Sequence, residues 1–181
     1  MALPVIGFIC GSLRKGSINA QLTSALCARV EAAGIEVRHL DLGAYDLPIF
    51  HGDLESPAGL TQLKSDLLSC DGLIIVTPEY NGSLPALLKN AIDWVTTKGM
   101  DSFTDQIYGI AACTPGPLSG IMVLRELNYI LTRIGADVVT PHVGVGNADN
   151  AFDVDGALKA QPSSDMADQM IAKLLARIAT S

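Results

Sequence analysis

Short apolar runs alternate along the chain with longer segments in which apolar residues recur at helical spacing. The first run, residues 4–10, is nearly all apolar, which is typical of a strand buried on both faces. Residues 17–33 then show an apolar residue every three to four positions, with Ser17 as the expected N-cap and Gly34 as the stop signal. This unit of a strand followed by a helix occurs five times in all. The predicted strands are 4–10, 35–40, 72–78, 107–113 and 136–140, and the predicted helices are 17–33, 59–70, 84–95, 120–134 and one that starts near Pro162.

This alternation predicts an α/β fold in which helices cover both faces of a five-stranded parallel sheet. We expect the flavodoxin-like strand order 2-1-3-4-5 in a single domain over residues 1–181. In such a sheet the ligand crevice lies beyond the carboxyl ends of the strands, beside the point where the strand order reverses. The loops after the first, third and fourth strands should therefore form the site.

Length and composition limit the classes of function that the chain can have. A chain of 181 residues with 49% hydrophobic residues can bury one ordinary core. The formal net charge of −7, with no basic run, argues against nucleic acid and anionic membranes as partners. The start of the chain lacks the basic region of a signal peptide, and no apolar run is long enough to cross a bilayer, so we expect a cytoplasmic location.

The residues that usually carry metal or nucleophile chemistry are scattered. The four cysteines show no C-x-x-C spacing and lie in apolar surroundings, as buried thiols of a reducing compartment do. The three histidines are isolated in sequence, and no Ser-His-Asp or Cys-His set is visible. We therefore expect no metal ion and no catalytic acid, base or nucleophile from the protein.

The first predicted site loop reads GSLRKGSIN, residues 11–19. Its glycines have the spacing of a P-loop, but Ser17 and Ile18 stand where that motif has lysine and then serine or threonine. Hydroxyls, an arginine and free N–H groups at a helix start favour a terminal monophosphate, as in flavin mononucleotide. The alternative is an ordinary strand-to-helix turn. The candidate phosphate ligands are Ser12, Arg14, Ser17, Ile18 and Asn19.

The second loop, TPEYNGS, follows the strongly apolar strand at 72–78. Proline and glycine constrain its backbone so that amides can face the polar edge of a flat ring, and the tyrosine offers an aromatic face. A surface turn with an exposed tyrosine is the alternative. The candidate ring contacts are Pro78, Glu79, Tyr80, Asn81 and Gly82.

With GSLRKGSIN after the first strand and PEYNGSLPALLKNAIDW after the third, the chain resembles the NAD(P)H-dependent FMN reductases, which include quinone and chromate reductases and azoreductase-like proteins. The resemblance implies that the first loop holds the FMN phosphate and that the second contacts the flavin ring. It also implies NADPH or NADH as co-substrate and a quinone-like or other small electron acceptor.

The third loop departs from this family. Better-known quinone-reducing members carry Gly-Gly-x-Arg and then Leu-Arg, whereas this chain has Met122 and Asn128 at the arginine positions. The resemblance therefore leaves open the substrate and subunit contacts that those arginines make. We expect FMN contacts from Thr114, Gly116 and Ser119.

The sequence leaves two functional interpretations open. The first is an NAD(P)H-dependent FMN reductase that forms a homodimer, with a tetramer as the alternative, through the helix at 84–95 or that at 120–134. The second is a flavodoxin-type electron carrier that never meets nicotinamide. Arg14 and Lys15 favour the reductase, since carriers usually have a phosphate loop without arginine.

Overall fold

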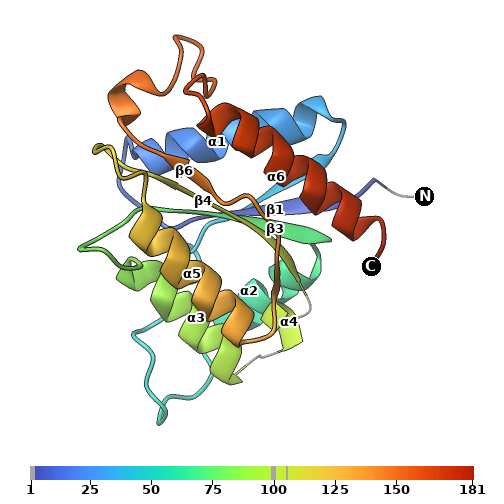
Figure 1. Cartoon of the computed structure of the whole chain (residues 1–181). Coiled ribbons are helices and arrows are strands. Elements are labelled where there is room, and N and C mark those ends of the chain that lie inside the picture. Colours follow the sequence, from blue (N-terminus) through green and yellow to red (C-terminus); the bar gives the residue numbers. More distant parts are fainter. Residues whose placement is uncertain (1–2, 99–100, 105) are drawn as a thin grey trace.

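The centre of the molecule is a parallel sheet, seen in a computed structural model that describes residues 3–98, 101–104 and 106–181 (Figure 1). The strands are arranged in the order β2-β1-β3-β4-β5, with β6 also paired to β4. This confirms the predicted flavodoxin-like order. The strands are β1 (Val5–Cys10), β2 (Glu36–Leu40), β3 (Gly72–Thr77), β4 (Ile107–Cys113), β5 (Asp137–Val138) and β6 (Val143–Val145).

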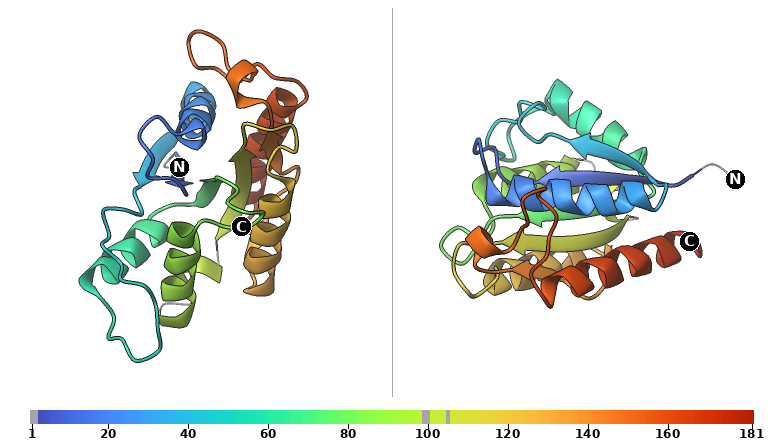
Figure 2. Two further views of the ribbon diagram at one scale, coloured as in Figure 1. Left: turned by 90° about the vertical axis from the view of Figure 1, so that its left-hand side faces the viewer. Right: turned by 90° about the horizontal axis from the view of Figure 1, so that it is seen from above.

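Helices lie on both faces of the sheet, as Figures 1 and 2 show. One apolar cluster joins the sheet to α1 and α6, and a second joins it to α2, α3 and α5 on the other face. Because both faces are covered, every residue of β3 and β4 is buried. The helices are α1 (Ile18–Ala32), α2 (Ala58–Leu68), α3 (Ala86–Lys98), α4 (Asp101–Thr104), α5 (Ile121–Arg133) and α6 (Ser163–Ile178), and Ala148–Asn150 form a 3₁₀ turn.

The edge of the sheet beyond β4 differs from the prediction. A strand was expected over residues 136–140, but β5 is limited to Asp137–Val138, and the chain pairs with β4 again as β6. Pro141 lies between the two strands and has no N–H to donate to β4, which explains the interruption. The short helix α4 was not predicted either.

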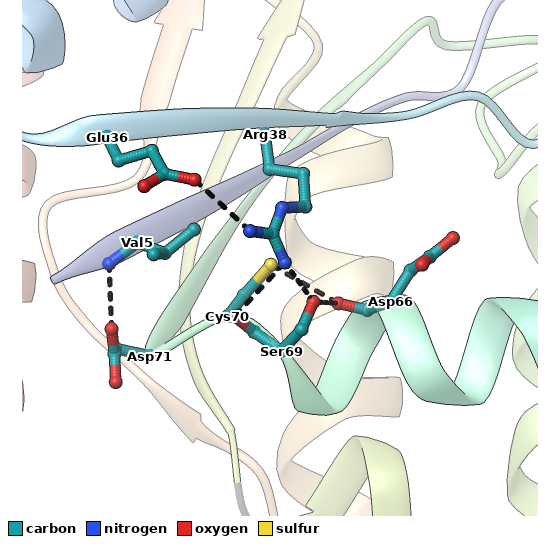
Figure 3. A network of polar contacts seen from close by, with 7 residues as sticks. All are labelled: Val5, Glu36, Arg38, Asp66, Ser69, Cys70 and Asp71. Atoms are coloured by element: carbon teal, nitrogen blue, oxygen red, sulfur yellow. Dashed lines mark hydrogen bonds and ion pairs between the residues drawn. The ribbon is translucent and has the colours of Figure 1, made fainter.

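Polar contacts link β1, β2 and the end of α2 near the amino edge of the sheet (Figure 3). The N–H of Val5, where β1 begins, donates to the Asp71 carboxylate over 2.7 Å. The Arg38 guanidinium on β2 bonds to Glu36 on its own strand, and to the carbonyl and hydroxyl oxygens of Ser69 just after α2. These contacts occupy the amino edge of the sheet, and the long loops lie at the opposite, carboxyl edge.

Candidate functional site

The loops after β1, β3 and β4 meet at the carboxyl edge of the sheet, at the left in Figure 1, and line a cavity of about 420 Å³. This volume falls within the range of small-molecule sites, roughly 300–1,000 Å³. The predicted residues that line it are Ser12, Arg14, Ser17, Ile18, Asn19, Pro78, Glu79, Tyr80 and Thr114.

Some predicted residues lie outside this cavity. Asn81 and Gly82 form the tip of the second loop, and Gly116 lies farther along the third. Ser119 lines a different cavity of about 440 Å³, which it shares with His142. Conversely, Cys113 and Pro115 line the first cavity although the sequence analysis did not select them. Their position on either side of Thr114 was the available signal.

The first loop presents the start of α1 to the cavity. The Ser17 hydroxyl accepts hydrogen bonds from the N–H groups of Asn19 at 3.2 Å and Ala20 at 3.4 Å, which confirms it as the N-cap. The Ile18 N–H has no acceptor within the described part of the chain. A helix start with a free N–H group carries a partial positive charge and favours an anion.

Two basic side chains stand beside this helix start. Arg14 and Lys15 are both exposed, and neither makes an ion pair with any residue in the described ranges. Arg14 lines the cavity, whereas Lys15 does not. The Arg14 guanidinium can therefore form charge-assisted hydrogen bonds to an anionic ligand without first losing a protein partner.

Asn19 connects the first loop to the third. Its side-chain amide donates to the Cys113 carbonyl over 3.0 Å and accepts from the Cys113 N–H over 2.9 Å. The residue is only 2% exposed. The sequence analysis assigned this amide to a phosphate, but in the structure its oxygen and one of its N–H groups are engaged by the backbone at the end of β4.

The second loop contains a two-residue turn at Asn81-Gly82. Both residues are left-handed, with φ angles of 53° and 78°, and the flanking Tyr80 and Ser83 exchange two backbone hydrogen bonds of 3.1 Å. Asn-Gly is the favoured pair for such a type I′ turn. The turn leaves the Tyr80 side chain at the edge of the cavity, where the residue is 51% exposed.

Glu79 caps a helix that lacks a cap of its own. Gly120, the residue before α5, has a φ angle of 70° and no side chain, and the Glu79 carboxylate accepts from the N–H groups of Met122 and Val123 at 3.1 Å. In return, Glu126 of α5 accepts hydrogen bonds from Ser83 and Leu84. The sequence analysis did not select Glu126, although a glutamate beside the apolar face of a helix was a usable signal.

The cavity offers donors and an aromatic ring but no activated nucleophile. Cys113 lines the cavity, and burial raises its pKa to about 12, which keeps its thiol protonated at neutral pH. No group of three or more potential metal ligands occurs within residues 3–98, 101–104 and 106–181. In the same ranges no helix has the length and apolar character required to cross a membrane.

Comparison with known proteins identifies the family. The model of the NADPH-dependent FMN reductase family matches residues 4–150. The chain belongs to this family. This membership confirms the resemblance found in the two loop motifs and the assignment as an FMN-dependent oxidoreductase that uses NAD(P)H, and it favours the reductase over the electron carrier.

Individual members of the family support the same conclusion. A quinone reductase of Escherichia coli K12 is 35% identical over 133 residues, which are 71% of this chain and 70% of that protein. An NAD(P)H-dependent FMN reductase of Pseudomonas aeruginosa is 27% identical over 95% of this chain and 93% of its own. The solved structure of the flavoenzyme NAD(P)H:(acceptor) oxidoreductase FerB of Paracoccus denitrificans matches with a TM-score of 0.83 at 25% identity, over 98% of both chains.

Proposed function

We propose that residues 1–181 form one reductase domain that binds FMN in the cavity between the three loops and reduces small quinone-like acceptors with NAD(P)H. The observation that carries the proposal is that the exposed Arg14, the start of α1 and Tyr80 all line one cavity. These groups suit a molecule with a phosphate at one end and a flat ring at the other. The quinone reductases among the relatives support the acceptor class.

In this proposal the first loop binds the phosphate of FMN, and the other two loops border its ring. Arg14, the Ser12 hydroxyl and the Ile18 N–H bind the phosphate, and Ser17 orients the helix start. Asn19 acts by holding this loop to β4. Pro78, Glu79 and Tyr80 border the ring from the second loop, and Asn81 and Gly82 shape their turn. Thr114 and Pro115 border the ring from the third loop.

When bound, FMN supplies the redox chemistry by accepting a hydride from NAD(P)H and passing electrons to the acceptor. The protein would position the ring beside the exposed Tyr80 and would leave one face accessible to substrates. No separate dinucleotide fingerprint occurs in the sequence, so nicotinamide and acceptor use this same face in turn. The four free cysteines and the use of NAD(P)H fit a cytoplasmic location.

A homodimer would protect the open side of the site. Helix α5 exposes Ile121, Met122 and Tyr129 at 53%, 50% and 64%, and these side chains offer apolar surface for a subunit contact. We therefore favour α5 over α3 as the apolar contact. Sedimentation at micromolar concentration with FMN present should give a dimer. A monomer would reject this part of the proposal, and a tetramer would show a second contact.

The direct test of function uses the purified protein and FMN. We expect yellow, FMN-bound protein after reconstitution and desalting, and steady oxidation of NADPH or NADH with a quinone. Since both substrates use one face, double-reciprocal plots at several quinone concentrations should be parallel. Intersecting lines would indicate a separate acceptor pocket. Bound FMN without NAD(P)H oxidation would favour the electron carrier instead.

A further inference from the structure

Two carboxylates connect the Tyr80–Ser83 turn and helix α5 in opposite directions. From the loop, Glu79 accepts from the first N–H groups of α5, at Met122 and Val123. From the helix, Glu126 accepts from the Ser83 hydroxyl at 3.1 Å through Oε1 and from the Leu84 N–H at 3.0 Å through Oε2. Each segment therefore supplies hydrogen-bond acceptors for free donors of the other.

Glu126 provides the acceptor for a buried backbone N–H group. Leu84 is buried, and its N–H has no other acceptor within the described part of the chain. An unpaired buried N–H is unfavourable, and hydrogen bonds to a carboxylate are stronger than those between neutral groups. Glu126 is itself half-buried, so these bonds are partly shielded from water.

The same contact reaches the cavity through one intermediate residue. Ser83 is held by Glu126 on one side and exchanges both of its backbone hydrogen bonds with Tyr80 on the other. Tyr80 lines the cavity, whereas Glu126 does not. A displacement of Ser83 would therefore move Tyr80 relative to the first and third loops.

We propose that Glu126 is a positioning residue for the flavin ring: it fixes the Tyr80–Ser83 turn on α5 and so sets the position of Tyr80 at the site. This inference rests on the proposed binding of FMN in the cavity. The role is one of geometry rather than charge. A glutamine at 126 can keep both contacts, because its amide oxygen can accept from Leu84 and its NH₂ group can donate to the Ser83 hydroxyl oxygen.

The test compares Glu126→Ala and Glu126→Gln with Ser83→Ala, which removes only one of the two contacts. Glu31→Ala, an exposed glutamate on α1, is the matched control. Backbone hydrogen exchange of the protein without FMN reports on the clamp, that is, the contacts of Glu126 with Ser83 and Leu84. FMN titration and NAD(P)H turnover report on the site. We expect Glu126→Ala to accelerate exchange at Ser83 and Leu84 and to lower kcat/KM about two- to tenfold, with little change in FMN affinity, because its effect on the site passes through Tyr80.

The glutamine variant should stay within about twofold of the wild type in every measurement, and Ser83→Ala should lie between the two. A glutamine variant as impaired as the alanine variant would show that charge matters, which overturns the positioning role. Unchanged turnover in Glu126→Ala, despite faster exchange, would overturn it too. If the wild type bound no FMN, the proposed function would fail as well, and the exchange data would still show whether the clamp exists. Should Glu126→Ala fail to fold, Ser83→Ala decides the matter.

Discussion

The side chain of Asn19, in the first turn of α1, pairs with both backbone polar groups of Cys113, the last residue of β4. The two residues are 94 positions apart in the chain, and the pair is buried. It joins the start of α1 to the end of β4. The first loop is thereby fixed relative to the third loop, independently of any ligand.

Asn19→Ala should destabilise the fold. The substitution removes two hydrogen bonds and leaves the Cys113 N–H and carbonyl buried without these partners, so we expect the free energy of unfolding to fall by about 2 to 4 kcal/mol. Urea denaturation of the protein without FMN measures this. Asn128→Ala on α5 is the control, because the Asn128 side chain makes no hydrogen bond within the described residues. Equal losses in the two variants would contradict the assigned role.

His142 should make the stability sensitive to acid. Burial lowers its pKa, and its buried Nε2 atom has no hydrogen-bond partner among the residues that the structure describes. The unfolded chain takes up a proton as the pH falls below about 6.5, whereas the folded protein does so only at lower pH. The stability should therefore decrease as the pH falls from about 6.5 to the lower pKa of the folded state, and remain unaffected by this group above that range.

His142→Gln should flatten the corresponding part of the plot of unfolding free energy against pH. His51→Gln serves as the control, since His51 is exposed and its only ion-pair partner in the described ranges, Asp53, is fully exposed. Chemical denaturation at half-unit intervals between pH 5 and 8 gives the comparison. An unchanged slope in His142→Gln would show that the imidazole titrates alike in both states.

The strand order and the position of the site followed from the sequence because they depend on patterns with a direct physical cause. The apolar runs at 72–78 and 107–113 are buried strands because helices cover both sheet faces. Parallel strands in this order bring the loops after them to one edge, so the cavity could be located before any contact was known. Ser17 illustrates the same point, since a hydroxyl before an apolar helix predicts an N-cap.

The contacts that were missed depend on pairing between distant segments. Neither Asn19 with Cys113 nor Glu126 with Leu84 has a local signature, because each joins elements that meet only in the folded chain. Strand β6, which lies beyond the last predicted strand at 136–140, was missed for a different reason. Pro141 marks the interruption between β5 and β6 in the sequence, but only the register on β4 shows that pairing resumes after the proline.

Arg14 should distinguish FMN from riboflavin. Its guanidinium makes charge-assisted hydrogen bonds to the phosphate in the proposed site, so Arg14→Ala should weaken FMN binding by about 1.5 to 3 kcal/mol. Riboflavin binding should hardly change. Lys15→Ala removes a neighbouring positive charge that does not line the cavity, and should have a much smaller effect that salt suppresses. Fluorescence titration of the wild type and both variants with each ligand measures these affinities. Equal losses for FMN and riboflavin in Arg14→Ala would show that the arginine does not meet a phosphate.

Tyr80 should affect turnover more than FMN retention, which is the reverse of Arg14. Tyr80 is half exposed at the edge of the cavity, so its ring is available to a nicotinamide or quinone on the accessible face of the flavin in the proposed site. Aromatic contacts contribute about 0.5 to 1.5 kcal/mol, so Tyr80→Ala should lower kcat/KM about two- to tenfold while the FMN dissociation constant changes little. Tyr80→Phe keeps the ring and the type I′ turn and should behave like the wild type. The opposite effects of Tyr80→Ala and Arg14→Ala are decisive, because a general loss of stability would lower both kcat/KM and FMN affinity in both variants. If Tyr80→Ala released FMN as readily as Arg14→Ala, the tyrosine would be a cofactor anchor, and the open face would have to be bordered by other residues.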